Sequence, residues 1–195
     1  ARCRPARFGQ AGTLALNMTK TRIAIAGAGY IGQAHMAVAR ASASVMLSAI
    51  VDPAPAAADI AAQAGVPLYQ SLEELLARDR PDGLILATPN PLHVPQALQC
   101  IDAKLPILLE KPIATTVAEG AQLVQRVKQT GARVLIGHHR AHSPIMAKAC
   151  EVIASGQLGQ LVAVMGSATF LKPDHYFADA PWRREPGAGP ILLNM

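Results

Sequence analysis

A glycine-rich turn carries the clearest chemical signal in this sequence. Gly27, Gly29 and Gly32 follow the apolar run Ile23–Ala26 in the spacing G-x-G-x-x-G, and a helical pattern begins directly after them. In a dinucleotide-binding turn, the first glycine permits the tight bend, the second lets the backbone approach a pyrophosphate, and the third lets helix and strand pack closely. Glycine-rich turns also arise for structural reasons alone, so a second signal is needed. The residues expected at the phosphates are Gly27, Ala28, Gly29, Tyr30, Ile31 and Gly32.

An acidic residue stands at the distance that such a turn requires. The apolar run Met46–Val51 ends at Asp52, about 20 residues after Gly32. A carboxylate at the end of a second strand accepts hydrogen bonds from adenosine ribose hydroxyls and repels the extra phosphate of NADP. Asp52 therefore favours NAD as cofactor, with NADP as the alternative. The local interpretation is that Asp52 only opens a turn with Pro53, as Asp-Pro often does.

Three polar motifs follow later apolar runs, where parallel strands are expected to end. They are Thr88–His93, Glu110–Pro112 and Gly137–Arg140. Ligands bind at the carboxyl edge of a parallel sheet, so these motifs are expected to meet at one site. Each motif also has a structural interpretation. Asn90 is expected to cap its helix in any case, His93 could be a half-buried or surface histidine, and Glu110 and Lys111 could form a solvated pair. The two histidines of the third motif could be ordinary polar residues at a domain junction.

The elements that must position these motifs alternate between strands and helices from Met18 onward. This alternation predicts an α/β fold with a doubly wound parallel sheet of six strands. The expected strands are 22–26, 46–51, 66–69, 83–87, 106–109 and 134–137, and the expected helices are 30–41, 54–64, 71–77, 90–101, 116–130 and 143–155. Capping boxes at Ser71 and Thr116 mark two helix starts. In the helix after Thr116, the stripe expected to face the core is Val117, Ala121, Val124 and Val127.

The composition changes after residue 138. Gln160–Phe170 alternates in the way expected of a strand that has one more polar face. Leu171–Pro190 is rich in Pro, Gly and charged residues, which predicts a long loop. At the other end, residues 1–17 are Arg-rich and lack acids, which favours a disordered leader or a segment read from upstream of a start at Met18. The nucleotide-binding domain is therefore expected at 18–138, followed by an incomplete second domain at 139–195.

Composition excludes several other classes of protein. Of the 195 residues, 51% are hydrophobic, as in a globular protein with a sizeable core. The net charge of +5 comes from scattered residues and the aromatic content is 4%, so no nucleic-acid partner is expected. The three cysteines include no C-x-x-C pair, which argues against a disulfide framework or a zinc site and suits a cytoplasmic location. No apolar run approaches the length of a membrane span, so no membrane partner is expected.

Taken together, the motifs resemble those of the Gfo/Idh/MocA oxidoreductases, which include glucose–fructose oxidoreductase and inositol dehydrogenase. The resemblance covers Lys20 to the last residue and rests on G-x-G-x-x-G, T-P-N-x-x-H, E-K-P, G-H-H-R and the W-R and G-A-G-P segments at Trp182 and Gly187–Pro190. It implies a Rossmann domain followed by an α+β domain with a large, mostly antiparallel sheet. It also implies hydride transfer between nicotinamide and a hydroxyl-bearing carbon of a sugar, cyclitol or related polyol, and homo-oligomers for a full-length form.

The resemblance assigns roles to residues that match its motifs. Lys111 becomes the catalytic lysine, whose ammonium stabilises developing alkoxide charge and moves a proton. Glu110 and Asn90 are expected near the nicotinamide ribose and phosphate, and His93 along the cofactor cleft. Thr88 and Lys111 complete the cofactor set, and no metal ligand is expected. The candidate substrate residues are His138, His139, Arg140, Trp182 and Arg183.

Two departures from the family pattern affect the expected activity. The position of the family's catalytic Asp, aligned through Gly187–Pro190, is occupied by Leu193, and its catalytic His would lie past Met195. The chain is therefore expected to be a C-terminally truncated oxidoreductase that is inactive as written. The alternatives are a non-catalytic NAD(P)-binding or partner-binding module, and a nucleic-acid-binding regulator supported only by the net charge.

Overall fold

The computed structural model describes residues 20–167, 169, 171–178 and 181–184, with the side chain of residue 182 left out. The described residues divide into two units, a first made of residues 20–137 and 181–184, and a second made of the described residues between 138 and 178. Each unit is described by itself below. Within the described residues, no helix has both the length and the apolar character needed to cross a membrane.

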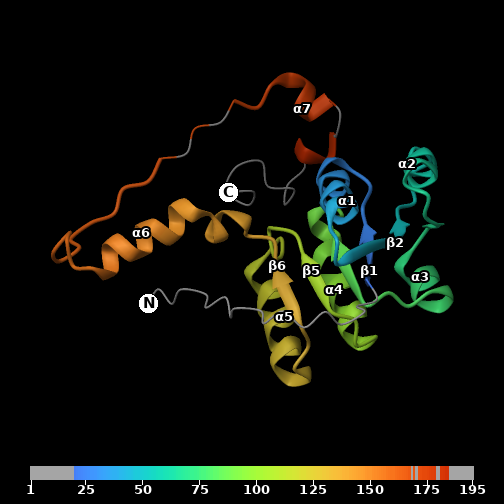
Figure 1. Cartoon of the computed structure of the whole chain (residues 1–195), viewed down its shortest axis with the longest axis horizontal. Coiled ribbons are helices and arrows are strands. Elements are labelled where there is room, and N and C mark those ends of the chain that lie inside the picture. The colour runs from blue at the N-terminus through green and yellow to red at the C-terminus, as the bar shows by residue number, and fades with distance from the viewer. Residues whose placement is uncertain (1–19, 168, 170, 179–180, 185–195) are drawn as a thin grey trace. The chain divides into compact units, whose positions relative to one another are not determined.

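The first unit contains a six-stranded parallel sheet in the order β3-β2-β1-β4-β5-β6 (Figure 1). The chain order reverses between β1 and β4, which leaves a crevice at their carboxyl ends, the usual place for a ligand in such a sheet. The predicted doubly wound sheet is confirmed. The strands are β1 Thr21–Ala26, β2 Val45–Val51, β3 Leu68–Tyr69, β4 Gly83–Leu86, β5 Ile107–Leu109 and β6 Val134–Ile136.

Helices cover both faces of the sheet, and each face has its own hydrophobic cluster. One cluster joins β1 and β2 to the helices α1 and α2, through side chains such as Ile25, Met36 and Ala61. The other joins the sheet to α3, α4 and α5, through side chains such as Leu75 and Leu123. The helical segments of this unit are α1 Tyr30–Ala41, α2 Ala57–Ala64, α3 Leu72–Arg78, η1 Asn90–Leu92, α4 His93–Asp102 and α5 Val117–Thr130.

Local sequence explains where several helices begin and end. The Ser71 hydroxyl accepts the backbone N–H of Glu74, and Thr116 and Glu119 form a reciprocal capping box, as predicted. At Ser71 the box is one-sided, because the Glu74 carboxylate accepts the backbone N–H of Gln70 instead. Gly131 ends α5 in the left-handed conformation, with φ of 66°.

The predicted core-facing stripe of α5 is wrong. Val117 is 92% exposed and Val124 is also exposed, whereas Leu123 is buried and Val127 packs against the core. The helix turns its Gly120 side toward Ile113 and Ala114, whose side chains would lie 3.8 and 3.6 Å from a Cβ built on Gly120, in ordinary van der Waals contact. Leu123 and Val127 lie three and seven positions after Gly120, so they share its face.

The second unit confirms one sequence prediction and corrects another. Ser143 caps α6, Pro144–Ala154, by accepting the backbone N–H of Met146. The predicted strand 160–170 is wrong for its described residues, which form no strand. A strand needs a neighbour for its backbone N–H and C=O groups, and no strand is described after β6. The predicted loop contains short helical segments. The remaining segments of this unit are η2 His139–His142 and α7 Asp174–Ala178, and η3 Pro181–Arg184 belongs to the first unit.

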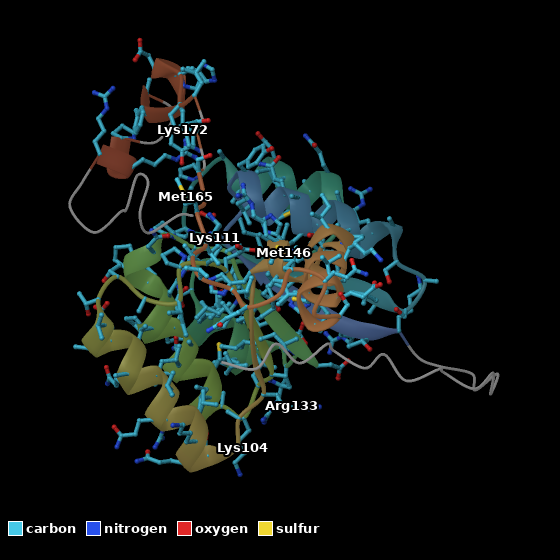
Figure 2. The ribbon with its side chains drawn as sticks, turned by 90° about the vertical axis from the view of Figure 1, so that its left-hand side faces the viewer. Lys104, Lys111, Arg133, Met146, Met165 and Lys172 are labelled. Carbon is cyan, nitrogen blue, oxygen red and sulfur yellow. The ribbon has the colours of Figure 1, made fainter. Side chains whose placement is uncertain are left out.

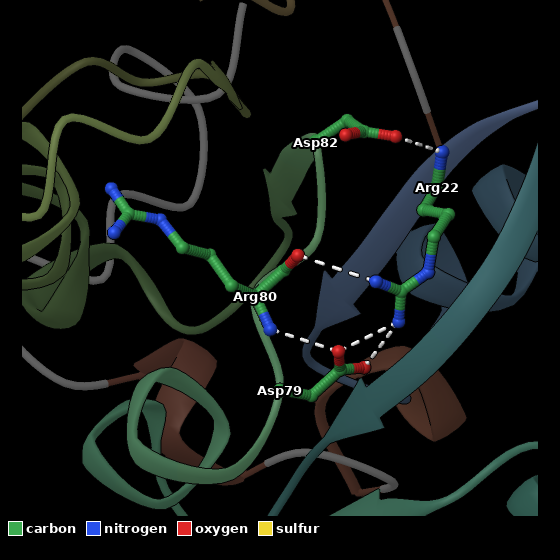
Figure 3. A network of polar contacts seen from close by, with 4 residues as sticks. All are labelled: Arg22, Asp79, Arg80 and Asp82. Carbon is green, nitrogen blue, oxygen red and sulfur yellow. Dashed lines mark hydrogen bonds and ion pairs between the residues drawn. The ribbon is translucent and has the colours of Figure 1, made fainter.

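A polar network ties the start of β1 to the loop before β4 (Figure 3). The Arg22 guanidinium donates to both carboxylate oxygens of Asp79, over 2.6 and 2.7 Å, and to the carbonyl of Arg80. The backbone N–H of Arg22 donates to Asp82 over 2.8 Å. The hydrogen bond and charge of Asp79 raise the pKa of Arg22. This network joins the amino-terminal ends of the central strands β1 and β4, and the glycine-rich turn lies at their opposite ends.

Candidate cofactor-binding and active site

The glycine-rich turn lies at the carboxyl end of β1. Gly27 has a positive φ of 94°, and its N–H donates to the carbonyl of Val51 over 2.8 Å. A Cβ at this position would lie 2.4 Å from the carbonyl oxygen of Ala87, and a Cβ at Gly32 would lie 1.8 Å from that of Gly27. These distances are far below van der Waals contact, so the fold itself requires glycine at positions 27 and 32.

Gly29 differs from the other two glycines because no protein atom lies within 4 Å of a Cβ built there. It is exposed and precedes α1, whose first turn has no side-chain cap and no acidic residue. The first N–H groups of a helix have no partner within it and attract anions. Open space beside an uncapped helix start fits the pyrophosphate of a dinucleotide. Tyr30 and Ile31, both exposed, follow directly.

Asp52, at the end of β2, lies against the glycine-rich turn. One carboxylate oxygen accepts the N–H of Ala28 over 2.7 Å, and the other accepts the N–H of Ala54 over 2.8 Å. The second contact is the local turn that the Asp-Pro pair predicts. The first contact brings the carboxylate to the phosphate-binding turn. Because a carboxylate oxygen accepts more than one hydrogen bond, these contacts leave Asp52 able to accept from a ribose hydroxyl.

The loop after β4 is held by its own side chains. The Thr88 hydroxyl donates to the side-chain carbonyl of Gln96 on α4 over 2.6 Å. The prediction that Asn90 caps the helix is wrong, because the segment opens as a 3₁₀ turn with Pro89 at its N-cap and no side-chain cap bond. Proline fixes the backbone of this turn, so Asn90 lies inside it and is buried, with 6% of its surface exposed.

His93, the first residue of α4, is 1% exposed. Its Nδ1 lies 2.7 Å from the carbonyl oxygen of Pro112, and its Nε2 lies 2.9 Å from that of Thr88. Both partners are carbonyl oxygens that can only accept, and a neutral ring carries a single N–H, so the tautomer decides which of the two receives a hydrogen bond. The ring connects the loop after β4 to the loop after β5 and exposes almost no surface to a cleft.

Glu110, directly after β5, is buried beside α1. Its Oε1 accepts a hydrogen bond from Nε2 of His35 over 2.9 Å, and its Oε2 accepts the backbone N–H of Lys111 over 3.2 Å. Burial alone would raise the pKa of Glu110. The hydrogen bonds from His35 and Lys111, together with their charges, outweigh burial and hold this pKa below its ordinary value. The carboxylate is therefore an anion at neutral pH.

Gly137, directly after β6, provides the space for that anion. A Cβ at this position would lie 2.8 to 3.0 Å from the carboxyl atoms of Glu110. The backbone N–H of Gly137 also donates to the carbonyl of Leu109 over 2.7 Å. The carboxyl end of the sheet thus brings α1, β5 and β6 together around one carboxylate.

Lys111 follows Glu110 at the carboxyl edge, and the Lys111–Pro112 peptide bond is cis. Figure 2 shows Lys111 at the end of the sheet opposite Lys104 and Arg133, which precede β5 and β6. Within the described residues, no group of three or more His, Cys, Asp or Glu side chains could hold a metal ion.

The candidate substrate residues follow the sheet in the chain. His138, His139 and Arg140 are exposed, at or within η2 of the second unit, and Arg183 lies in η3. The side chain of Trp182, the segment Gly187–Pro190 and Leu193 lie outside the described residues.

Sequence reasoning missed His35 and Gln96 as members of the site, and it named Gly137 without its contact with Glu110. His35 lies three positions after Gly32 on α1, the spacing that puts two residues on one helix face. Gly137 follows β6 at the sheet edge where Glu110 follows β5. Both signals are present in the sequence, but only once the neighbouring elements are placed.

A profile of the GFO_IDH_MocA family, described as an oxidoreductase family with an NAD-binding Rossmann fold, matches residues 21–138. The chain belongs to this family. The Gfo/Idh/MocA assignment agrees with the site, where a glycine-rich turn, an acidic residue after β2 and the E-K-P motif share one sheet edge. NAD is therefore the cofactor that the Rossmann unit of this Gfo/Idh/MocA chain is built to bind.

Similar Gfo/Idh/MocA proteins have varied names. The rhizopine catabolism protein MocA of Rhizobium meliloti is 31% identical over 147 residues, which cover 75% of this chain and 46% of that protein. Inositol 2-dehydrogenase of Mycolicibacterium smegmatis is 32% identical over 148 residues, covering 73% and 43%. The structure of the WlbA dehydrogenase from Bordetella pertussis, in complex with NADH and UDP-GlcNAcA, is 28% identical, with a TM-score of 0.79 over 85% of this chain and 51% of that one. The chain thus spans about half the length of the curated relatives it matches.

Proposed function

We propose that this chain binds NAD across the carboxyl edge of its sheet as part of an enzyme that oxidises or reduces a sugar, cyclitol or related polyol. The observation that carries the proposal is the open space at Gly29, beside the uncapped start of α1 and the carboxylate of Asp52. The fold itself does not require glycine there, whereas an approaching pyrophosphate does.

We assign each residue to the adenosine half or the nicotinamide half of the cofactor according to its place in the sheet. Asp52 follows β2, on the adenosine side, where its negative charge favours NAD over NADP. Thr88, Asn90, His93, Glu110 and Lys111 follow β4 and β5, on the nicotinamide side. When bound, the nicotinamide supplies a hydride acceptor or donor.

Lys111 carries the proton chemistry in this proposal. Its ammonium donates a hydrogen bond to the substrate hydroxyl or carbonyl oxygen and stabilises the negative charge that develops there. The same group gives or takes the proton of that oxygen. The backbone on either side of Lys111 is tied to other elements, at Glu110 and at Pro112, which favours a fixed direction for the amine.

The substrate class is taken from the relatives' names and from the family. Inositol and a UDP-sugar appear in the names of similar proteins and structures. His138, His139, Arg140, Trp182 and Arg183 are the proposed polyol-binding residues. A homo-oligomer is proposed only for a full-length form. A cytoplasmic setting is proposed because the three cysteines of the sequence include no C-x-x-C pair.

Two measurements test this function. Calorimetry on the folded chain is expected to detect NADH binding, and absence of heat with NAD, NADH, NADP and NADPH would contradict the proposal. In a full-length parent, Lys111→Ala is expected to lower kcat by about a thousandfold, with NADH affinity within several-fold of wild type. Lys128→Ala, which removes an exposed lysine of α5, is the control and should leave kcat unchanged.

A second candidate function is a non-catalytic NAD-binding or partner-binding module. It is favoured by Leu193, which stands where the family pattern has its catalytic Asp and cannot exchange a proton. A full-length protein that binds NADH tightly but oxidises no member of a polyol panel would establish this alternative. Turnover of any one polyol would exclude it.

A further inference from the structure

We propose that His35 and His93 are positioning residues that hold the segment carrying Lys111 from its two sides. The inference rests on the proposed function, because it assumes that this segment faces the nicotinamide half of NAD. Neither histidine is placed to act on the substrate. His35 acts through Glu110, and His93 acts through the carbonyl of Pro112.

His35 secures the N-terminal side of Lys111. Its Nε2 donates to Oε1 of Glu110, and the other oxygen of that carboxylate accepts the backbone N–H of Lys111. Both side chains are largely buried, with 24% of His35 and 12% of Glu110 exposed, so water competes little for this hydrogen bond. Gly137 limits the other side of the carboxylate, because even a methyl group there would contact it.

His93 secures the C-terminal side of Lys111. One ring nitrogen lies 2.7 Å from the carbonyl of Pro112, and the other lies 2.9 Å from the carbonyl of Thr88. The ring is almost completely buried, so loss of either contact leaves a polar group without water to replace it. The loops after β4 and β5 therefore have a fixed spacing, set by the width of one imidazole.

The two contacts connect the halves of the nucleotide site. His35 belongs to α1, whose start is proposed to bind the pyrophosphate, while Glu110 and Pro112 flank the residue proposed to meet the substrate. If His35 serves this connection, its loss should weaken binding of the nicotinamide half and spare the adenosine half. If it only stabilises α1, both halves should suffer alike.

The experiment compares two ligands, NADH and ADP-ribose, which lacks the nicotinamide. Titration calorimetry on the full chain is expected to show NADH affinity about tenfold lower in His35→Ala, with ADP-ribose affinity within twofold of wild type. His35→Gln should recover most of the NADH affinity, because its side-chain amide can donate to Glu110 from a position close to that of Nε2. His175→Ala, which removes an exposed histidine of α7, is the matched control.

His93 allows each of its two contacts to be kept separately. The amide of His93→Asn is near the position of Nδ1 and can still donate to Pro112, whereas that of His93→Gln is near Nε2 and can donate to Thr88. NADH affinity should be lower in His93→Gln than in His93→Asn. The amide NMR signal of Lys111 should shift in His35→Ala and His93→Gln and remain in place in His175→Ala. Circular dichroism and ADP-ribose binding report whether each variant is folded.

The outcomes separate this inference from the proposed function. If the wild-type chain binds neither ligand, the proposed function fails and the positioning role fails with it. If wild type binds both and a folded His35→Ala binds NADH as tightly, the positioning role alone is overturned. Equal weakening of both ligands in His35→Ala also overturns it, because that result assigns His35 to the stability of α1.

Discussion

The carboxylate of Asp52 accepts the backbone N–H of Ala28 over 2.7 Å, so the end of β2 holds the glycine-rich turn directly. One side chain is therefore placed to do two things. It fixes the turn proposed to receive the pyrophosphate, and it presents a negative charge where the adenosine ribose is expected. These two roles can be separated by substitution.

Asp52→Asn is expected to keep the contact with Ala28 through its one amide oxygen and to lose the local contact with Ala54, while removing the charge that repels a ribose phosphate. The ratio of NADPH to NADH affinity should rise about tenfold, a change of roughly 1.4 kcal/mol. Fluorescence titration with both coenzymes measures the ratio. Asp52→Ala, which also loses the turn contact, should weaken both coenzymes. An unchanged ratio in Asp52→Asn would show that the carboxylate does not select the coenzyme.

Gly29→Ala and Gly32→Ala should have opposite effects on folding and binding. A methyl group at position 29 meets no protein atom, so the melting temperature should stay near that of wild type while NADH binding is lost. A methyl group at position 32 would lie 1.8 Å from the Gly27 carbonyl oxygen. This overlap should destabilise the fold by about 2–4 kcal/mol. Thermal unfolding and NADH titration of both variants provide the test, which fails if Gly29→Ala binds normally.

Glu110 should contribute to acid unfolding in a defined direction. Its pKa is lower in the folded protein than its ordinary value, so the folded state favours the ionised form. The resulting stabilisation is complete above about pH 4.3, the ordinary pKa of a glutamate, and is lost as the pH falls through the lower folded pKa. Urea unfolding at a series of pH values should show that the free energy of unfolding falls less on acidification in Glu110→Gln than in wild type. Parallel curves for the two proteins would contradict this expectation.

The Arg22–Asp79 pair should matter more for stability than an ordinary surface ion pair. Asp79 is mostly buried and receives two hydrogen bonds from one guanidinium, whereas Arg78 and Glu74 form a more exposed pair within α3. Asp79→Ala should reduce the free energy of unfolding by about 1 kcal/mol, because Arg22 remains partly exposed and solvent screens part of the attraction. Arg78→Ala should change it by less than about 0.5 kcal/mol. Chemical denaturation compares the two, and equal losses would remove the distinction.

Much of the fold follows from local sequence. The helix after the glycine-rich turn begins at Tyr30 and ends at Ala41, as the sequence predicts, and Ser71 and Thr116 act as N-caps. These features depend on residues close together in the chain, and a strand buried on both faces reads as a continuous apolar run. The face of α5 could not be chosen in this way, because Val117 and Leu123 are both apolar and only packing against the neighbouring loop selects Leu123.

The site was predicted in its parts but not in its contacts. The glycine spacing and the E-K-P motif both predicted residues at the carboxyl edge of the sheet, where the structure has them. The hydrogen bond between His35 and Glu110 depends on which face α1 turns toward the residue after β5, and the space at Gly137 depends on the register of β6 against β5. A sequence pattern fixes neither the rotation of a helix nor the relation of two distant strands. The burial of His93 could not be predicted for the same reason, because it depends on contacts with two loops that are separate in the sequence.

The outermost strands of the sheet are very short, with two residues in β3 and three in β6. Each edge therefore offers few backbone groups that a strand from another molecule could pair with. Long exposed edges are templates for strand pairing between molecules, and such pairing leads to aggregation. In this unit, the brevity of β3 and β6 is a built-in protection against that kind of aggregation.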